Sequence, residues 1–260
     1  MILRFFPKLC FAAAASLYLF TLGVFQSRHR ALIFQICRHF GWDRKRTEPQ
    51  VPPVALETVL SNPLQAQVFH PAPKAGNVSL VELLVLTDLV RARRCEQVFE
   101  IGTFDGRTTL NLAAALGDRG RILTLDLPSA LADETKFGLA KDEDAFVRKA
   151  QSGGLFAGSP QASRIVQLLG DSAVFDYSPY LGQVDLVFID GSHAYDYVVS
   201  DSANALKLLR PSGGIILWHD YTGHWPELTH ALNELCLNDS RFSGMRHIGG
   251  TSLVLLEVRS

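Results

Sequence analysis

Short apolar runs alternate with helix-length segments through most of this chain, and that alternation limits the folds it can adopt. Each run is five or six residues long, which suits a buried strand better than a helix. The runs occupy residues 97–101, 121–126, 165–169, 184–189 and 214–218. Because strands that alternate with helices form a parallel sheet covered on both faces, we predict an α/β fold with a Rossmann-like, doubly wound sheet.

Helix and turn signals fill the intervals between these strands. Ser79 and Glu82 form a capping-box sequence, which predicts a helix from there to about residue 92. Further helices are predicted at residues 108–116, 197–209 and 226–237. Near the end, Gly249-Gly250 is a tight-turn sequence between strands at 245–248 and 252–258, and this hairpin adds an antiparallel last strand.

Charge divides the chain into two parts. Residues 1–48 hold eight Lys/Arg and two Asp/Glu, whereas residues 49–260 hold seventeen and twenty-four. A mildly acidic body gives no electrostatic reason to expect a nucleic acid partner. We predict three parts: N-terminal helices at 1–48, a proline-rich linker at 49–76 and a catalytic domain at 77–260.

The segment from Leu9 to Phe25 contains no charged residue over 17 positions. Its length of roughly 25 Å is at the short end for a bilayer span. We expect a single N-terminal membrane anchor, and a soluble packing helix or a cleaved signal peptide are the alternatives. Basic residues after the segment, including 44–46, outnumber those before it, so the following domain is expected on the cytoplasmic side.

Glycine or polar residues follow all five predicted strands of the sheet. They are Gly102 and Gly106 after the first, Asp126 after the second, Asp171 and Ser172 after the third, Asp190 and His193 after the fourth, and His219 and Asp220 after the fifth. Ligands of such sheets bind outside the carboxyl ends of the strands, so these residues predict a ligand site. Asp126 is placed to accept hydrogen bonds from both hydroxyls of a ribose.

The first loop argues against a dinucleotide. A pyrophosphate needs the pattern G-x-G-x-x-G, but this chain has E-x-G-x-x-x-G, and Phe104 occupies the position of the second glycine. An adenosine that carries a cationic sulfonium and an amino acid fits better, because Glu100, Asp126 and Asp190 supply negative charge nearby.

Five segments resemble the class I S-adenosylmethionine-dependent methyltransferases, and within them the methyltransferase domain 24 family, which is related to macrocin-type O-methyltransferases. The segments are FEIGTFDGRTTL (99–110), LD (125–126), LGDS (169–172), FIDGSHAY (188–195) and LRPSGGIILWHD (209–220). The resemblance covers about residues 77–258. It implies a seven-stranded sheet with an antiparallel last strand, and S-adenosyl-L-methionine as cofactor. The cofactor-binding residues it implies are Glu100, Gly102, Thr103, Gly106, Asp126, Leu127, Asp171, Ser172 and Asp190.

The ends of the fourth and fifth strands carry the residues expected to do chemistry. Methylation of a hydroxyl needs a general base or a Lewis acid, and His193 with Asp190 is the candidate catalytic pair. A purely helix-capping role for His193 is the alternative. Asp190, His219 and Asp220 are the candidate ligands of a metal such as Mg²⁺, although a histidine departs from the usual oxygen-only set. Asp201 is expected on a solvated helix face, and the alternative is that it faces the site.

We therefore predict an S-adenosylmethionine-dependent methyltransferase that methylates a hydroxyl of a small molecule or sugar. The alternatives are an NAD(P)-dependent oxidoreductase on a Rossmann sheet and a non-catalytic S-adenosylmethionine-binding module. Residues 128–160 have no regular pattern and are expected to form an insertion over the site.

Overall fold

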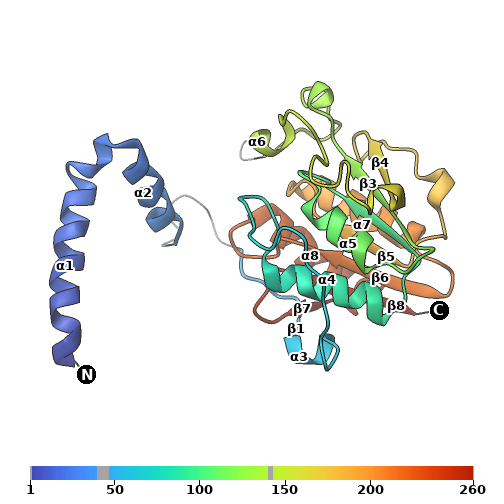
Figure 1. Cartoon of the computed structure of the whole chain (residues 1–260), viewed down its shortest axis with the longest axis horizontal. Coiled ribbons are helices and arrows are strands. Elements are labelled where there is room, and N and C mark those ends of the chain that lie inside the picture. The colour runs from blue at the N-terminus through green and yellow to red at the C-terminus, as the bar shows by residue number, and fades with distance from the viewer. Residues whose placement is uncertain (1, 40–46, 140–142, 260) are drawn as a thin grey trace. The chain divides into compact units, whose positions relative to one another are not determined.

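The computed structural model describes residues 2–39, 47–139 and 143–259, and it divides the chain into two compact units, Met1–Arg46 and Thr47–Ser260 (Figure 1). The first unit consists of α1 (Ile2–Phe20), the 3₁₀ helix η1 (Gly23–Phe25) and α2 (Ser27–His39). Residues 44–46, on which the predicted orientation partly depended, lie outside the described residues.

The first unit corrects the prediction that residues 9–25 form a single membrane-spanning helix. The uncharged stretch 9–25 is not one helix, because α1 ends at Phe20 and a turn separates it from η1. Thr21 Oγ1 donates to the carbonyl oxygen of Leu17, at 2.7 Å, where α1 ends. Among the described residues, no helix has both the length and the apolar character needed to cross a bilayer.

The second unit is built on one sheet of eight strands, in the order β1-β7-β8-β6-β5-β2-β3-β4. The strands are β1 (Pro53–Val54), β2 (Gln97–Ile101), β3 (Arg121–Asp126), β4 (Ile165–Leu169), β5 (Leu186–Ile189), β6 (Gly213–Trp218), β7 (Arg246–Ile248) and β8 (Val254–Arg259). From β6 to β4 all neighbours are parallel, and β8 runs antiparallel to both β6 and β7. The predicted α/β fold with a mostly parallel sheet and an antiparallel last strand is confirmed.

The eighth strand was not predicted. Pro53 and Val54 pair with His247 and Ile248 in parallel, at the edge of the sheet beyond the terminal hairpin. A proline is tolerated there because it begins an edge strand, where its missing N–H leaves no gap in a ladder. The seven strands implied by the family resemblance therefore carry a short addition from the proline-rich segment.

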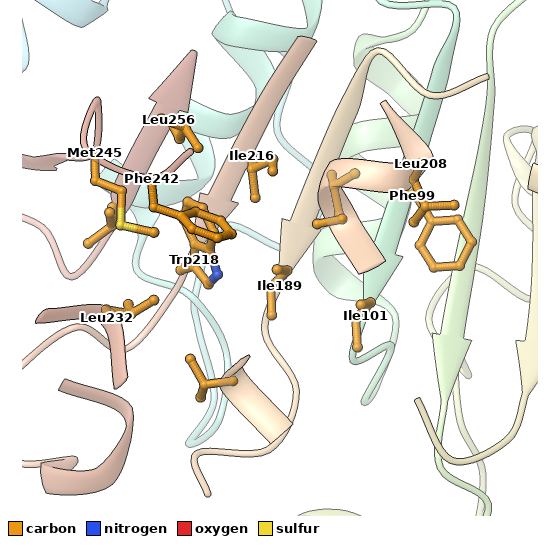
Figure 2. Packing of buried hydrophobic residues seen from close by; sticks show 14 of the residues in the cluster. Phe99, Ile101, Ile189, Leu208, Ile216, Trp218, Leu232, Phe242, Met245 and Leu256 are labelled. Atoms are coloured by element: carbon orange, nitrogen blue, oxygen red, sulfur yellow. The ribbon is translucent and has the colours of Figure 1, made fainter. Parts of the chain in front are cut away.

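Helices cover both faces of the sheet and divide its interior into two cores. On one face α4 (Leu80–Ala92) and α5 (Arg107–Ala115) pack on residues such as Val98 and Phe188. On the other face, α7 (Tyr195–Leu208) and α8 (Pro226–Asn238) pack on Phe99, Ile189 and Trp218. Figure 2 shows these three strand residues within the core. Short helices α3 (Leu56–Val59), α6 (Asp144–Val147), η2 (Ser129–Leu131), η3 (Ala162–Arg164) and η4 (Ser178–Tyr180) lie in the connections.

The proline-rich segment belongs to the second unit and is hydrogen-bonded to the rest of it. The backbone N–H groups of Gln50 and Val51 both donate to Tyr221 Oη, at 2.7 and 2.9 Å. Asn233 Nδ2 donates to the carbonyl oxygen of Glu48 at 2.9 Å, and Val51 is buried in the core below α8. Further along, the buried Arg107 guanidinium donates to three backbone carbonyls, those of His70, Pro71 and Val78.

Candidate active site

The site is built around the junction of β2 and β5, where the strand order reverses. Gly102 follows β2 with φ +101°, a conformation that favours glycine. A Cβ placed on Gly102 would lie 2.0 Å from the carbonyl oxygen of Asp190, which follows β5. The two strand ends therefore meet backbone to backbone, at the position where open α/β sheets bind their ligands.

The loop after Gly102 leads directly into α5. Gly106 is the N-cap of this helix with φ +85°, and its N–H donates to the carbonyl oxygen of Thr103 at 2.9 Å. Thr103 Oγ1 is 2.7 Å from Thr124 Oγ1 on the neighbouring strand. At the start of α5, the backbone N–H of Arg107 donates to Asp105 Oδ1 at 3.0 Å, so a side chain of the loop itself caps the helix.

Glu100 lies beneath this loop and not on its surface. The side chain is fully buried and accepts hydrogen bonds from Thr109 Oγ1 and Thr124 Oγ1, at 2.5 and 2.6 Å. Burial raises the pKa of Glu100 to about 8, with the Asp190 and Asp126 carboxylates adding to the effect. In this arrangement Glu100 supports the loop from below.

Asp126 ends β3 and is nearly buried. Its Oδ2 forms an ion pair with Lys149 Nζ at 2.8 Å and also accepts a hydrogen bond from Ser152 Oγ. Leu127, the next residue, is half-buried. Both partners of Asp126 come from the irregular segment 128–160.

Asp171 follows β4 and is also buried. Its Oδ1 accepts from Tyr197 Oη at 2.9 Å and from the backbone N–H of Ala173 at 3.0 Å, while its Oδ2 accepts from the backbone N–H of Lys136 at 2.8 Å. Ser172 beside it is half-buried, and its carbonyl oxygen accepts from Tyr177 Oη.

Described residues of the insertion, on both sides of 140–142, contact several of the predicted site residues and the loop that joins them. Besides the contacts with Asp126 and Asp171, the backbone N–H groups of Gly153 and Leu155 donate to the carbonyl oxygens of Phe104 and Asp105 in the glycine loop, at 2.9 and 3.0 Å. The insertion therefore contacts the loop that the family resemblance assigns to the cofactor. Its individual contacts carry no periodic signal from which sequence reasoning could have found them.

His193 lies between two carboxylates. Its Nε2 is 2.9 Å from Asp220 Oδ2, its Nδ1 is 2.9 Å from Glu143 Oε1, and its ring stacks on Trp225 with centroids 3.7 Å apart. Burial disfavours the charged imidazole, but the carboxylates of Asp220 and Glu143 outweigh it and raise the pKa of His193 to about 9. The backbone N–H of His193 also donates to Glu143, which sequence reasoning did not identify.

Asp190, His219 and Asp220 converge as predicted for a metal centre. His219 Nδ1 is 3.0 Å from Asp190 Oδ1 and 3.3 Å from Asp220 Oδ2, and one ligand atom from each residue lies within 4.8 Å of the others. Two carboxylate oxygens and an imidazole nitrogen form a donor set that suits a divalent cation. Asp220 is held here with φ +62°, and its amide N–H donates to Ser252 Oγ at 3.2 Å.

The charge balance of this cluster depends on its two histidines. Burial lowers the pKa of His219, but Asp190, Asp220 and Glu82 outweigh it and raise the pKa well above the usual range. Burial alone would raise the pKa of Asp220, yet the hydrogen bonds to His193 and His219 hold it well below its usual range. Protons on the two imidazoles therefore offset part of the negative charge of the four carboxylates that contact them.

Glu82 is a member of the cluster that the sequence assigned to a different role. The predicted capping box is confirmed, since Glu82 N–H donates to Ser79 Oγ and Ser79 N–H donates to Glu82 Oε2. The same carboxylate also lies 3.3 Å from His219 Nε2 and accepts from Ser252. The Glu82 side chain therefore belongs both to the N-terminal cap of α4 and to the surroundings of the candidate metal centre.

The sheet order is Rossmann-like, and the match of residues 99–221 to a methyltransferase family indicates the class of protein: an S-adenosylmethionine-dependent methyltransferase. Residues 99–221 match the model of the methyltransferase domain 24 family, described as "Methyltransferase domain", which is the family that the motifs resemble. A search of curated protein sequences finds no match.

Solved structures of methyltransferases are similar to the chain. An S-adenosylhomocysteine-bound methyltransferase from Podospora anserina is 18% identical with a TM-score of 0.50, over 71% of this chain and 80% of that one. An O-methyltransferase from Streptomyces achromogenes involved in tomaymycin synthesis, in complex with S-adenosylmethionine, is 21% identical with a TM-score of 0.48, over 71% and 82%. An O-methyltransferase from Bacillus cereus in complex with S-adenosylhomocysteine is 20% identical with a TM-score of 0.49, over 72% and 84%. At these identities the similarity concerns the fold.

Proposed function

We propose that the chain transfers the methyl group of S-adenosylmethionine to a hydroxyl of a small molecule or sugar. The observation that carries this proposal is the cluster of Asp190, His193, His219 and Asp220 beside the glycine loop. Transfer to a hydroxyl needs groups that lower the hydroxyl's pKa and take its proton, and the cluster offers both.

The cofactor would lie along the carboxyl ends of β2, β3 and β4. Gly102, Thr103 and Gly106 would hold the methionine part and the start of the ribose, above Glu100. Asp126 would bind the ribose hydroxyls with Leu127 against the adenine, and Asp171 with Ser172 would meet the adenine edge. Support comes from the carboxyl-end edge of the sheet that these residues share and from the match of residues 99–221 to a methyltransferase domain.

Asp190, His219 and Asp220 would hold a divalent cation such as Mg²⁺ at the ends of β5 and β6. When bound, such a cation acts as a Lewis acid that makes a coordinated hydroxyl more acidic. Asp190 and Asp220 supply the negative charge, and Asp190 also lies next to the glycine loop, so the acceptor oxygen and the methyl donor would be brought to the same place.

His193 would take the proton of the acceptor hydroxyl. With both carboxylates in contact its pKa is about 9, so the imidazole carries a proton at neutral pH and becomes a base as the pH rises towards that value. We therefore expect the rate of transfer to increase between about pH 7 and pH 9. A rate that is constant over this range would remove His193 from the role of base.

The test of this function is calorimetric titration of the full chain with S-adenosylhomocysteine, with and without Mg²⁺. We expect micromolar binding, a loss of at least about tenfold in Asp126→Asn, and unchanged binding in the exposed control Asp118→Asn. A folded chain that binds no S-adenosylhomocysteine would contradict the proposal. Titration with NADH in the same buffer tests the oxidoreductase alternative, for which Phe104 in the glycine loop is unfavourable.

A further inference from the structure

We propose that Glu82 is a positioning residue that fixes which nitrogen of His219 carries the proton, and thereby makes His219 a ligand for the cation. The inference rests on the cation site of the proposed function. Glu82, in the first turn of α4, would thus influence cation binding by residues at the ends of β5 and β6.

The contacts of Glu82 hold its carboxylate in one place. The side chain is 6% exposed, and Oε1 accepts from both the N–H and the Oγ of Ser252, each at 2.7 Å. Oε2 accepts from Ser79 N–H at 2.8 Å and lies 3.3 Å from His219 Nε2. In each of these three short contacts, with Ser252 N–H, Ser252 Oγ and Ser79 N–H, a carboxylate oxygen of Glu82 is the acceptor. The group facing His219 is therefore an acceptor only.

This acceptor decides the state of the imidazole. An ionised carboxylate facing Nε2 keeps a proton on Nε2, because only an N–H makes a favourable contact with it. Nδ1 would then be the nitrogen that offers a lone pair to a cation, and it lies 3.0 Å from Asp190 Oδ1 and 3.3 Å from Asp220 Oδ2. Metal-binding histidines commonly donate their second ring N–H to a carboxylate in this way, which orients the ring and makes the ligand nitrogen more basic.

A helix cap alone does not account for this arrangement. A capping box requires the glutamate to reach only the backbone N–H of the N-cap residue. Here the same carboxylate connects three places: the start of α4, the β7–β8 turn through Ser252, and the end of β6 through His219. The contacts beyond Ser79 are what a positioning role requires.

The substitution Glu82→Gln tests the inference. The two donors of Ser252 require an acceptor at the Oε1 position, so the amide oxygen will occupy that place and the NH₂ group will face His219 Nε2 and Ser79 N–H. An NH₂ donor facing Nε2 favours the tautomer with the proton on Nδ1, which cannot bind a cation. We expect the affinity of the full chain for Mn²⁺, measured by calorimetry without cofactor, to fall about 10–100-fold.

Ser79→Ala is the matched control. It removes the cap bond from Glu82 N–H to Ser79 Oγ but keeps the Glu82 carboxylate and the backbone N–H that contacts it. We expect its Mn²⁺ affinity to stay within about twofold of the parent chain while its melting temperature falls, because an N-cap serine contributes to helix stability. If Ser79→Ala loses as much Mn²⁺ affinity as Glu82→Gln, Glu82 acts through helix stability and the inference is wrong.

A second measurement needs no variant. In the ¹⁵N-labelled parent chain loaded with Mg²⁺, long-range proton–nitrogen NMR correlations of His219 should show the proton on Nε2. A proton on Nδ1 would overturn the inference even if Glu82→Gln does not fold.

The same samples separate this inference from the proposed function. Absence of S-adenosylhomocysteine binding in the parent chain refutes the methyltransferase proposal itself. If S-adenosylhomocysteine binds but Mn²⁺ does not, the cation site and the inference both fail while cofactor binding stands. If both bind and Glu82→Gln leaves Mn²⁺ affinity unchanged, the inference alone fails.

Discussion

Gly102 shows how one residue can serve fold and site together. Its missing side chain lets β2 and β5 approach, since a Cβ would lie 2.0 Å from the Asp190 carbonyl oxygen, which is backbone that does not move freely. A variant at this position therefore changes the sheet as well as the glycine loop, and Asp126 is the better position for testing cofactor binding alone.

We predict that Gly102→Ala lowers the free energy of unfolding by about 2–5 kcal/mol, because the clash adds to the strain of a non-glycine residue at positive φ. Urea unfolding measures this loss. Gly117→Ala is the control, because no atom lies within 4 Å of a Cβ built there and unfolding should be nearly unaffected. Equal stability of the two variants would show that the junction of β2 and β5 adapts more easily than described.

Asp201 corrects the expectation of a solvated helix face. It is 1% exposed on the inner side of α7, and its spacing from Val198, Ala205 and Leu208 follows the buried stripe of the helix. The helical period therefore places Asp201 on the buried face, whereas the prediction of an exposed position rested on the charge of its side chain. Burial raises the pKa of Asp201 to about 7, and the Asp171 carboxylate adds to the increase.

We predict that Asp201→Asn stabilises the protein at alkaline pH. An acid whose pKa is raised on folding stabilises the folded state fully below its unfolded pKa of about 3.9, and this contribution is lost as the pH rises through the folded value of about 7. The melting temperature of the variant should exceed that of the parent by several degrees at pH 9, with little difference at pH 4. The exposed Asp196→Asn on the same helix should show no such dependence, and a parallel response of both variants would contradict the argument.

At the scale of elements, the insertion contacts the groups that the cofactor would need. Lys149 and Ser152 both contact Asp126, and the backbone of Lys136 contacts Asp171. A ribose that takes both oxygens of Asp126 must displace Lys149 or share the carboxylate with it. If the ribose displaces Lys149, removing the lysine should strengthen cofactor binding. If the ribose and Lys149 share the carboxylate, removing the lysine should weaken it.

We predict displacement: Lys149→Ala should strengthen S-adenosylhomocysteine binding several-fold, since the cofactor no longer competes with a buried ion pair. Lys136→Ala is the control within the same insertion, because its contact with Asp171 is made by the backbone N–H that alanine keeps. Calorimetry decides the question, and weaker binding in Lys149→Ala would mean that the lysine stays beside the bound ribose.

The regular elements could be predicted from sequence much better than the irregular ones. The strands from 97 to 218 were found within about two residues because buried strands leave uninterrupted apolar runs. β1 was missed because two residues among prolines carry no period. Glu143 and Lys149 were missed because a contact made by an irregular segment depends on where that segment folds back, which local sequence does not specify.

At the scale of the whole molecule, the chain consists of two compact units, and all candidate site residues belong to the second. Both hydrophobic cores are also made of residues from 51 onward. Each unit therefore has a different relation to function: the second carries the proposed chemistry, whereas the first contributes no residue to the site as described.

We predict that a chain beginning at Thr47 binds S-adenosylhomocysteine within about twofold of the full chain, because the deletion leaves both cores and every candidate ligand in place. Calorimetry on both chains measures this, with circular dichroism as the check on folding. A folded but non-binding second unit would assign residues 1–46 a part in the site.

The place where the second unit begins has a mechanical consequence. Gln50 and Val51 are held by Tyr221, and Glu48 by Asn233 of α8. A pulling force applied through residues 1–46 would enter the domain at these hydrogen bonds, and Tyr221 directly follows Asp220 of the candidate metal centre. Tension on the N-terminal segment would therefore be transmitted first to the residue adjoining the site, before it reached the remainder of the sheet.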